Sequence, residues 1–182
     1  QAEEAWAMQP NANGIVVAVI DGGVDIEHED LLGTIWTNEG EHPFNGQDDD
    51  GNGYVDDVHG WNFANDQANS AVPMDHGTHV PGTIAAIGDN NIGIIGVAPG
   101  AEWVACAPID RSGIAQTVAD AILSFQWIAD PDGNPLTSFD VPHTCSNSWG
   151  LVTSHGYPEC DQTFWAFIDN AEAAGVIVLF SA

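Results

Sequence analysis

The sequence predicts an α/β fold with three layers, a parallel sheet that carries helices on both faces. Short apolar runs rich in β-branched residues, such as 15–20 and 176–180, are typical of strands that are buried on both sides. Between such runs, Val118, Ile122 and Phe125 recur at helical spacing on one face. Because strands that alternate with helices form βαβ units, we expect one domain around a parallel sheet.

The individual elements follow from the same patterns, and Gly/Asn/Asp-rich stretches near 38–60 and 130–143 are expected to be surface insertions. The strands and helices are expected at the following positions: strands at 15–20, 103–109, 145–149 and 176–180, and helices at about 76–87, 118–129 and 164–171. The chain stops directly after the last of these strands. Since a buried parallel strand needs neighbours to cover it, we expect residues 1–182 to be a truncated part of a larger domain.

The charge balance limits the partners. The 182 residues are 44% hydrophobic and carry 27 acidic side chains against one basic side chain, Arg111, for a formal charge of -26. A chain with so few cations cannot neutralise phosphates, so we expect no nucleic-acid and no membrane partner, and no run is long enough to span a bilayer. The mutual repulsion of the carboxylates can be relieved by bound divalent cations or by a salty medium, and both alternatives stay open.

The densest acidic stretch, DDDGNGYVDD, predicts a calcium loop within an insertion at about 45–60. Its spacing follows positions one, three, five, six and nine of an EF-hand loop, but the twelfth position is His59 instead of a bidentate glutamate. We therefore expect a calcium loop on a different scaffold, with a merely solvated acidic turn as the alternative. The predicted ligands are Asp48, Asp50, Asn52, Asp56 and Asp57.

Two polar residues stand where chemistry is expected. Asp21 follows the first strand, and the carboxyl ends of parallel strands are where ligands and catalytic groups collect, although Asp-Gly-Gly is also common turn chemistry. His76 opens the expected helix, where it could serve as a general base or only as a helix cap. A metal pair of His76 with His79 is disfavoured because no glutamate stands between them.

Taken together, VAVIDGGVDIEHEDL, HGTHVPGTIAA, GVAPGAEW and SNSWG resemble the subtilisin-like serine protease (subtilase) family. The resemblance implies a secreted serine endopeptidase with a Ser-His-Asp triad, in which Asp21 orients His76 and His76 is the general base. FQWIADPDGNP followed by NSWG is similar to the bacillopeptidase F-like group within the family.

The family's serine turn and its oxyanion-hole asparagine have no counterpart in the chain, and both are expected after Ala182. Without the nucleophile no acyl-enzyme can form, and loss of an oxyanion donor alone costs about 10²–10³-fold. We therefore expect the fragment by itself to be inactive.

The resemblance also implies binding residues. Ser148, Trp149 and Gly150 match the segment that pairs with an extended protein or peptide substrate, and Ser112 with Gly113 resembles the opposite edge of that cleft. A second structural calcium site is implied by the following residues: Asp30, Asn90 and the carbonyls of Ile92 and Ile94. We expect a monomer.

Other features bear on this interpretation. Cys106 is expected to be a buried thiol, whereas Cys145 and Cys160 flank a loop and could pair in an oxidising compartment. Gly22 stands where relatives carry a serine or threonine that bonds the aspartate, and Pro81 interrupts the histidine helix.

Two rival functions remain. One is a non-catalytic, calcium-binding, subtilase-like module that only holds extended peptides. The other is a flavodoxin-like nucleotide-binding fold, which is disfavoured because no Gly-rich phosphate loop joins a strand to a helix.

Overall fold

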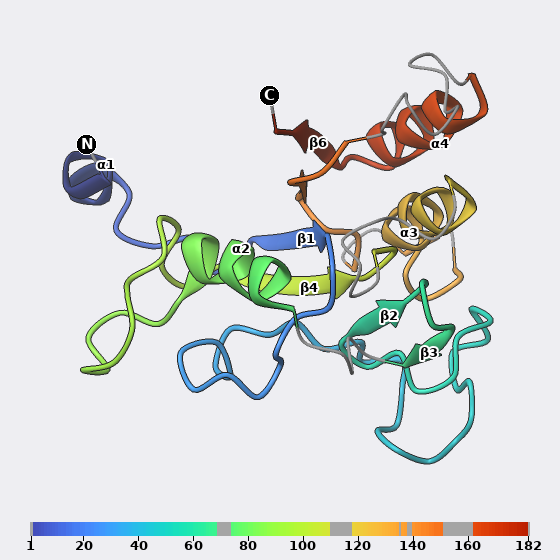
Figure 1. The fold of residues 1–182 in the computed structure, drawn as a ribbon, viewed down its shortest axis with the longest axis horizontal. Helices are drawn as coiled ribbons and strands as arrows, with labels where there is room; N and C mark the ends of the chain where they lie inside the picture. Colours follow the sequence, from blue (N-terminus) through green and yellow to red (C-terminus); the bar gives the residue numbers. More distant parts are fainter. Residues whose placement is uncertain are drawn as a thin grey trace.

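A computed structural model describes residues 2–68, 74–109, 118–134, 136–137, 140–150 and 162–181. Its centre is a sheet with the strand order β3-β2-β4-β1-β5-β6 (Figure 1). The strands are β1 (Val16–Ile20), β2 (Gly60–Asn62), β3 (Gln67–Ala68), β4 (Glu102–Cys106), β5 (Thr144–Asn147) and β6 (Ile177–Phe180). The helices are α1 (Ala2–Met8), α2 (Asp75–Ala85), α3 (Val118–Ala129) and α4 (Gln162–Ala173).

The sheet is parallel except at one edge. β1 lies in the middle, and its Val19 pairs with Ala105 of β4 on one side and with Ser146 of β5 on the other. β2 and β6 continue the parallel order, while the short β3 runs antiparallel to β2. Since the strand ends are aligned, Asp21, Ala107 and Ser148, which directly follow β1, β4 and β5, lie at one edge of the sheet.

Successive residues of β1 enter two different cores. Ala18 and Ile20 pack in the cluster that contains Phe125 of α3 and Ile168 of α4, whereas Val19 packs in the cluster that contains Ala85 of α2. Helices therefore cover both faces of the sheet, which confirms the predicted three-layer α/β fold. It also explains why the first strand is apolar at every position.

Three elements were not expected from the pattern. α1 buries none of its residues and is tied down by the Trp6 indole, which donates to the Val97 carbonyl at 3.0 Å. β2 and β3 are too short to form an apolar run. Moreover, the 38–60 stretch is not a pure surface insertion, because Asn38, Glu41 and Asp57 within it are buried.

Candidate active site

The aspartate and the histidine singled out in the sequence meet at the carboxyl end of β1. Asp21 is 2% exposed, and its Oδ1 lies 2.8 Å from Nδ1 of His76, while the His76 side chain is 60% exposed. The Gly22 backbone N–H donates to the same carboxylate oxygen at 2.7 Å. The pair thus combines a fixed carboxylate with an accessible imidazole.

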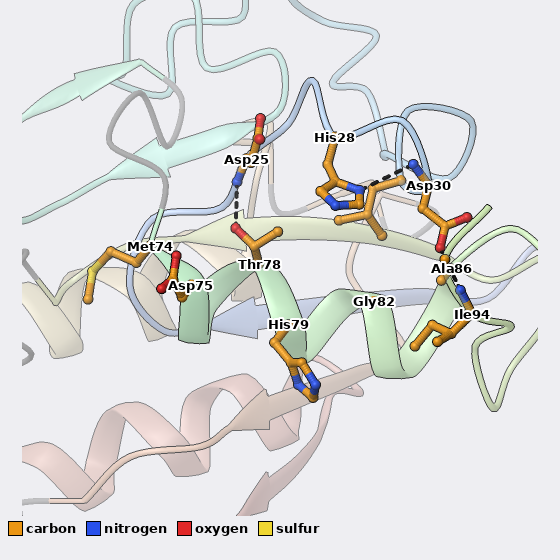
Figure 2. Close-up of a pocket in the computed structure, with 12 residues that line it drawn as sticks. Asp25, His28, Asp30, Met74, Asp75, Thr78, His79, Gly82, Ala86 and Ile94 are labelled. Carbon is orange, nitrogen blue, oxygen red and sulfur yellow. Dashed lines mark hydrogen bonds between the residues drawn. The ribbon is translucent and has the colours of Figure 1, made fainter.

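The first turn of α2 is fastened to the turn that follows β1. Met74 donates its backbone N–H to the Gly23 carbonyl at 2.7 Å, and the Asp25 N–H donates to Thr78 Oγ1 at 2.9 Å, a bond drawn in Figure 2. A Cβ on Gly77 would lie 2.6 Å from the carbonyl oxygens of both Gly22 and Gly23. Only glycine allows this approach, which carries His76 to within hydrogen-bond distance of Asp21.

This geometry suits general-base chemistry. With the imidazole proton on Nδ1, the Nδ1–H group donates a hydrogen bond to the Asp21 carboxylate, which fixes the ring orientation and stabilises the imidazolium that forms when Nε2 takes up a proton. Because the His76 side chain is exposed, a hydroxyl can approach Nε2 and give up its proton to it.

Of the two departures from the family pattern, Gly22 has a visible consequence and Pro81 does not interrupt its helix. The other carboxylate oxygen of Asp21, Oδ2, is buried and has no hydrogen-bond partner among the described residues. This was expected, because glycine at position 22 has no hydroxyl that could donate to it. The Met74 side chain fills the space beside Gly22, since a Cβ there would lie 2.4 Å from its sulfur. α2 continues through Pro81 without a break.

The SWG segment has a structural role in addition to the predicted one. The Trp149 indole N–H donates to the Ile20 carbonyl at 2.8 Å, and its ring packs edge-on against Phe164 and Phe180. This side chain therefore joins the ends of β5 and β1, directly before Asp21. Substrate pairing by Ser148, Trp149 and Gly150 stays a prediction, and Ser112 and Gly113 lie outside the described residues.

The acidic loop gathers three carboxylates, of Glu41, Asp50 and Asp57, whose ligand atoms lie within 4.8 Å of one another. Asp57 is fully buried and accepts hydrogen bonds from the Trp127 indole at 2.6 Å and from the Asn52 amide at 2.9 Å. Burial raises the pKa of Asp57 to about 6. The sequence interpretation missed Glu41, which precedes the acidic run and which no spacing rule connects to it.

Two other predicted ligands of this loop, Asp48 and Asp56, instead hold the loop backbone through hydrogen bonds. Asp48 accepts the backbone N–H groups of Gly51 and Gly53, and Asp56 accepts those of Asn45 and Gly46. Within the described part of the chain, neither belongs to the three-carboxylate group. Asn52 donates to Asp57, so it does lie beside that group.

The residues predicted for the second calcium site are also brought together, and Figure 2 shows two of them, Asp30 and Ile94. Asp30 accepts the Asn90 amide at 2.6 Å and the Ile94 backbone N–H at 3.0 Å, and Ile92 donates to Asn90 Oδ1. The hydrogen bond from Asn90, followed by that from Ile94, lowers the pKa of Asp30, because both bonds favour the charged form of the carboxylate. The ion itself stays a prediction.

The cysteines bear on the redox prediction. Cys106 is a buried free thiol, as expected. Cys145 is also a buried free thiol, and burial raises its pKa to about 12. A free Cys145 does not agree with the possible disulfide to Cys160, a residue that itself lies outside the described part of the chain.

A parallel α/β sheet with an aspartate–histidine pair at its carboxyl edge is the arrangement of a subtilisin-type hydrolase domain. The chain belongs to the subtilase family, whose sequence profile matches residues 12–182. It is 49% identical over 108 residues to subtilisin-like protease 1 of Plasmodium vivax, with 56% of this chain and 17% of the relative covered. It is 33% identical over 187 residues to bacillopeptidase F of Bacillus subtilis strain 168, with 100% of this chain and 12% of the relative covered.

The fold has a counterpart among solved structures. A cold-adapted subtilisin-like serine proteinase superposes with a TM-score of 0.59 at 22% identity, over 92% of this chain and 46% of that chain. The 182 residues thus span about half of that chain and a much smaller share of the two curated relatives. Within the described residues, no helix is both long enough and apolar enough to cross a bilayer.

Proposed function

We propose that this chain supplies the aspartate and the histidine of a serine endopeptidase with a Ser-His-Asp triad. The observation that carries the proposal is the 2.8 Å contact between buried Asp21 and exposed His76 at the carboxyl end of a parallel strand. The proposal includes a serine and an oxyanion-hole asparagine from outside these 182 residues, which form only part of the catalytic domain. Residues 1–182 alone are then inactive.

The proposal extends to substrate and surroundings. Extended protein segments would pair with the backbone at Ser148–Gly150, which leaves the side-chain preference broad. Calcium would be a structural cofactor in the acidic loop and near Asp30, where carboxylate and amide oxygens gather. A secreted monomer fits a family of proteases that includes bacillopeptidase F.

The test uses the protein expressed from its whole reading frame. Asp21→Asn keeps the shape of the side chain but favours the wrong tautomer of His76, so kcat/KM for an unfolded protein substrate should fall about 10⁴-fold. His76→Ala should lower kcat/KM at least as far. Asp66→Asn is the matched control, because Asp66 is exposed and has a φ of 50° that asparagine tolerates.

Labelling with a fluorophosphonate separates this proposal from the non-catalytic alternative. An enzyme would be labelled at its serine, and the labelling rate would fall in the Asp21→Asn variant. Binding of extended peptides with neither hydrolysis nor labelling would instead establish the peptide-binding module.

A further inference from the structure

Met74, labelled in Figure 2, stands directly before α2 and two positions before His76. Its backbone joins two segments, because its N–H donates to the Gly23 carbonyl at 2.7 Å and its carbonyl accepts the N–H of Thr78 at 2.9 Å. Its φ of -118° and ψ of 142° are extended, so the helix begins only at the next residue. Met74 therefore connects the turn after β1 to the first turn of α2.

The partly buried Met74 side chain occupies the space that a side chain at position 22 would need. A Cβ on Gly22 would lie 2.4 Å from the Met74 sulfur and 3.1 Å from its terminal carbon. The φ of Gly22 lies outside the left-handed region, so the backbone conformation alone does not call for glycine. The glycine at position 22 thus makes room for a side chain, whereas Gly77 makes room for backbone oxygens.

The contact reaches the aspartate of the pair through Gly22. The Gly22 N–H donates to Asp21 Oδ1 at 2.7 Å, and Oδ1 is also the oxygen that lies 2.8 Å from His76 Nδ1. The second oxygen, Oδ2, is buried and has no hydrogen-bond partner among the described residues. Within the described part of the chain, hydrogen bonds therefore hold this carboxylate at one oxygen only. A shift of Gly22 would move one of the two groups that bond there.

We propose that Met74 is a positioning residue of the Asp21–His76 pair. Its backbone fixes where α2 begins and its side chain packs on Gly22, so this one residue sets the spacing between the histidine and the aspartate. Methionine suits this place, because its unbranched and flexible side chain fills irregular gaps. The catalytic part of the inference rests on the proposed function, in which Asp21 and His76 belong to a triad.

Steady-state kinetics of the protein expressed from its whole reading frame test the proposal. Met74→Ala should lower kcat about 10–10²-fold with little change in KM, because a displaced histidine weakens transition-state stabilisation and not substrate binding. Met74→Leu keeps most of the side-chain volume and should retain most of the wild-type kcat. Met8→Ala is the matched control, because Met8 is 84% exposed, and its kcat should be unchanged. An unchanged kcat in Met74→Ala would overturn the proposal, and a raised KM with that kcat would make Met74 a substrate contact instead.

A double-mutant cycle separates this contact from a general loss of packing. Gly22→Ala displaces the Met74 side chain, so it should lower kcat as Met74→Ala does. In the double variant the new methyl group lies in space that the methionine has left, so kcat should fall at most about twofold below that of Met74→Ala. Gly82→Ala, whose Cβ meets nothing within 4 Å, should have the same effect on kcat with and without Met74→Ala. A wild-type kcat in Gly22→Ala, or losses that multiply in the double variant, would overturn the contact.

Nitrogen NMR shifts of the His76 ring report on the pair without hydrolysis. Because the Asp21 contact keeps the proton of the neutral ring on Nδ1, Met74→Ala should raise the fraction of the Nε2–H tautomer, while Met74→Leu should not. A wild-type protein that neither hydrolyses substrate nor reacts with a fluorophosphonate would refute the protease, and the tautomer fraction would then decide on Met74. An unchanged fraction in a folded Met74→Ala variant, as judged by circular dichroism, would overturn the positioning role.

Discussion

Gly77 has no side chain, and the carbonyl oxygens of Gly22 and Gly23 occupy the space where one would begin. At the scale of single residues, the Asp21–His76 contact thus depends on groups that take no part in proton transfer. Thr78 and Trp149 act in the same way, through hydrogen bonds to Asp25 and Ile20 on either side of Asp21. Each is a positioning residue.

Gly77→Ala tests this dependence. Its Cβ meets backbone on the turn after β1, so α2 must shift, and overpacking should lower the free energy of unfolding by about 1–3 kcal/mol. In the active protease kcat should fall as well. Gly82→Ala is the matched control in the same helix, since its Cβ meets nothing within 4 Å, and it should stabilise by about 0.5–1 kcal/mol. Urea unfolding measures the free energy of unfolding of both variants. Equal changes in the two variants would contradict the positioning role of Gly77.

Trp149→Phe keeps an aromatic ring but removes the N–H that donates to the Ile20 carbonyl. An unsatisfied carbonyl at the end of β1 should cost about 1–3 kcal/mol of unfolding free energy. Trp165→Phe is the control, because Trp165 is half exposed and should contribute little. Denaturant unfolding compares the two variants, and a Trp149→Phe effect no larger than that of the control would exclude the positioning role.

At the scale of elements, the acidic loop is held by hydrogen bonds to two buried carboxylates, those of Glu41 and Asp57. Glu41 accepts the backbone N–H groups of Asp49 and Asp56, and Asp57 accepts the Trp127 indole of α3. The loop is therefore docked on a helix instead of extending into solvent. The same arrangement leaves Asp57 buried close to two other carboxylates.

The raised pKa of Asp57 makes the metal-free protein sensitive to pH. With a pKa of about 6 in the folded state against 3.8 otherwise, the folded state binds more protons, so stability decreases as pH rises from about 4 to about 6. The full shift corresponds to roughly 3 kcal/mol. Urea unfolding of the metal-free protein gives the free energy of unfolding at pH 5 and at pH 7. The difference between these two values should be smaller for Asp57→Asn than for the wild type. An unchanged difference would assign the pH dependence to other groups.

At the scale of the whole molecule, the protein has a formal charge of -26, and the described residues include no lysine and no arginine. Its carboxylates are not spread evenly. Among the described residues, Glu41, Asp50 and Asp57 meet in one group. A cavity of about 780 Å³ beside this group is lined by five described carboxylates, and Asp50 belongs to both: Glu39, Asp50, Glu102, Asp132 and Asp140. We expect divalent cations to bind at such clusters and to relieve the repulsion there, with a salty medium as the alternative.

Calcium and sodium should therefore act differently on the melting temperature. At one hundred times the dissociation constant, calcium stabilises by about 2.7 kcal/mol per site, equivalent to roughly 5–10 °C for a chain of this size. Sodium chloride at the same ionic strength should raise the melting temperature far less, and a chelator should reverse the calcium effect. Equal gains from both salts would instead support adaptation to a salty medium.

Much of the site could be predicted from the sequence because its parts are local. An apolar β-branched run identifies a buried strand, so Asp21 is recognised at its end, and HGTH identifies His76 at the start of a helix. The three layers follow from the alternation of strands and helices. These features depend on neighbours within a few residues.

Tertiary structure alone decided which distant residues meet. Trp149 binds Ile20 across 129 positions, Trp127 binds Asp57 across 70, and the cavity unites Asp50 with Asp140. No local pattern encodes such contacts, because they depend on how the sheet brings segments that are distant in the sequence together at each of its ends. The sequence by itself thus determined the aspartate, the histidine and the sheet that carries them, while packing determined their 2.8 Å contact and, in the acidic loop, the grouping of Glu41 with Asp50 and Asp57.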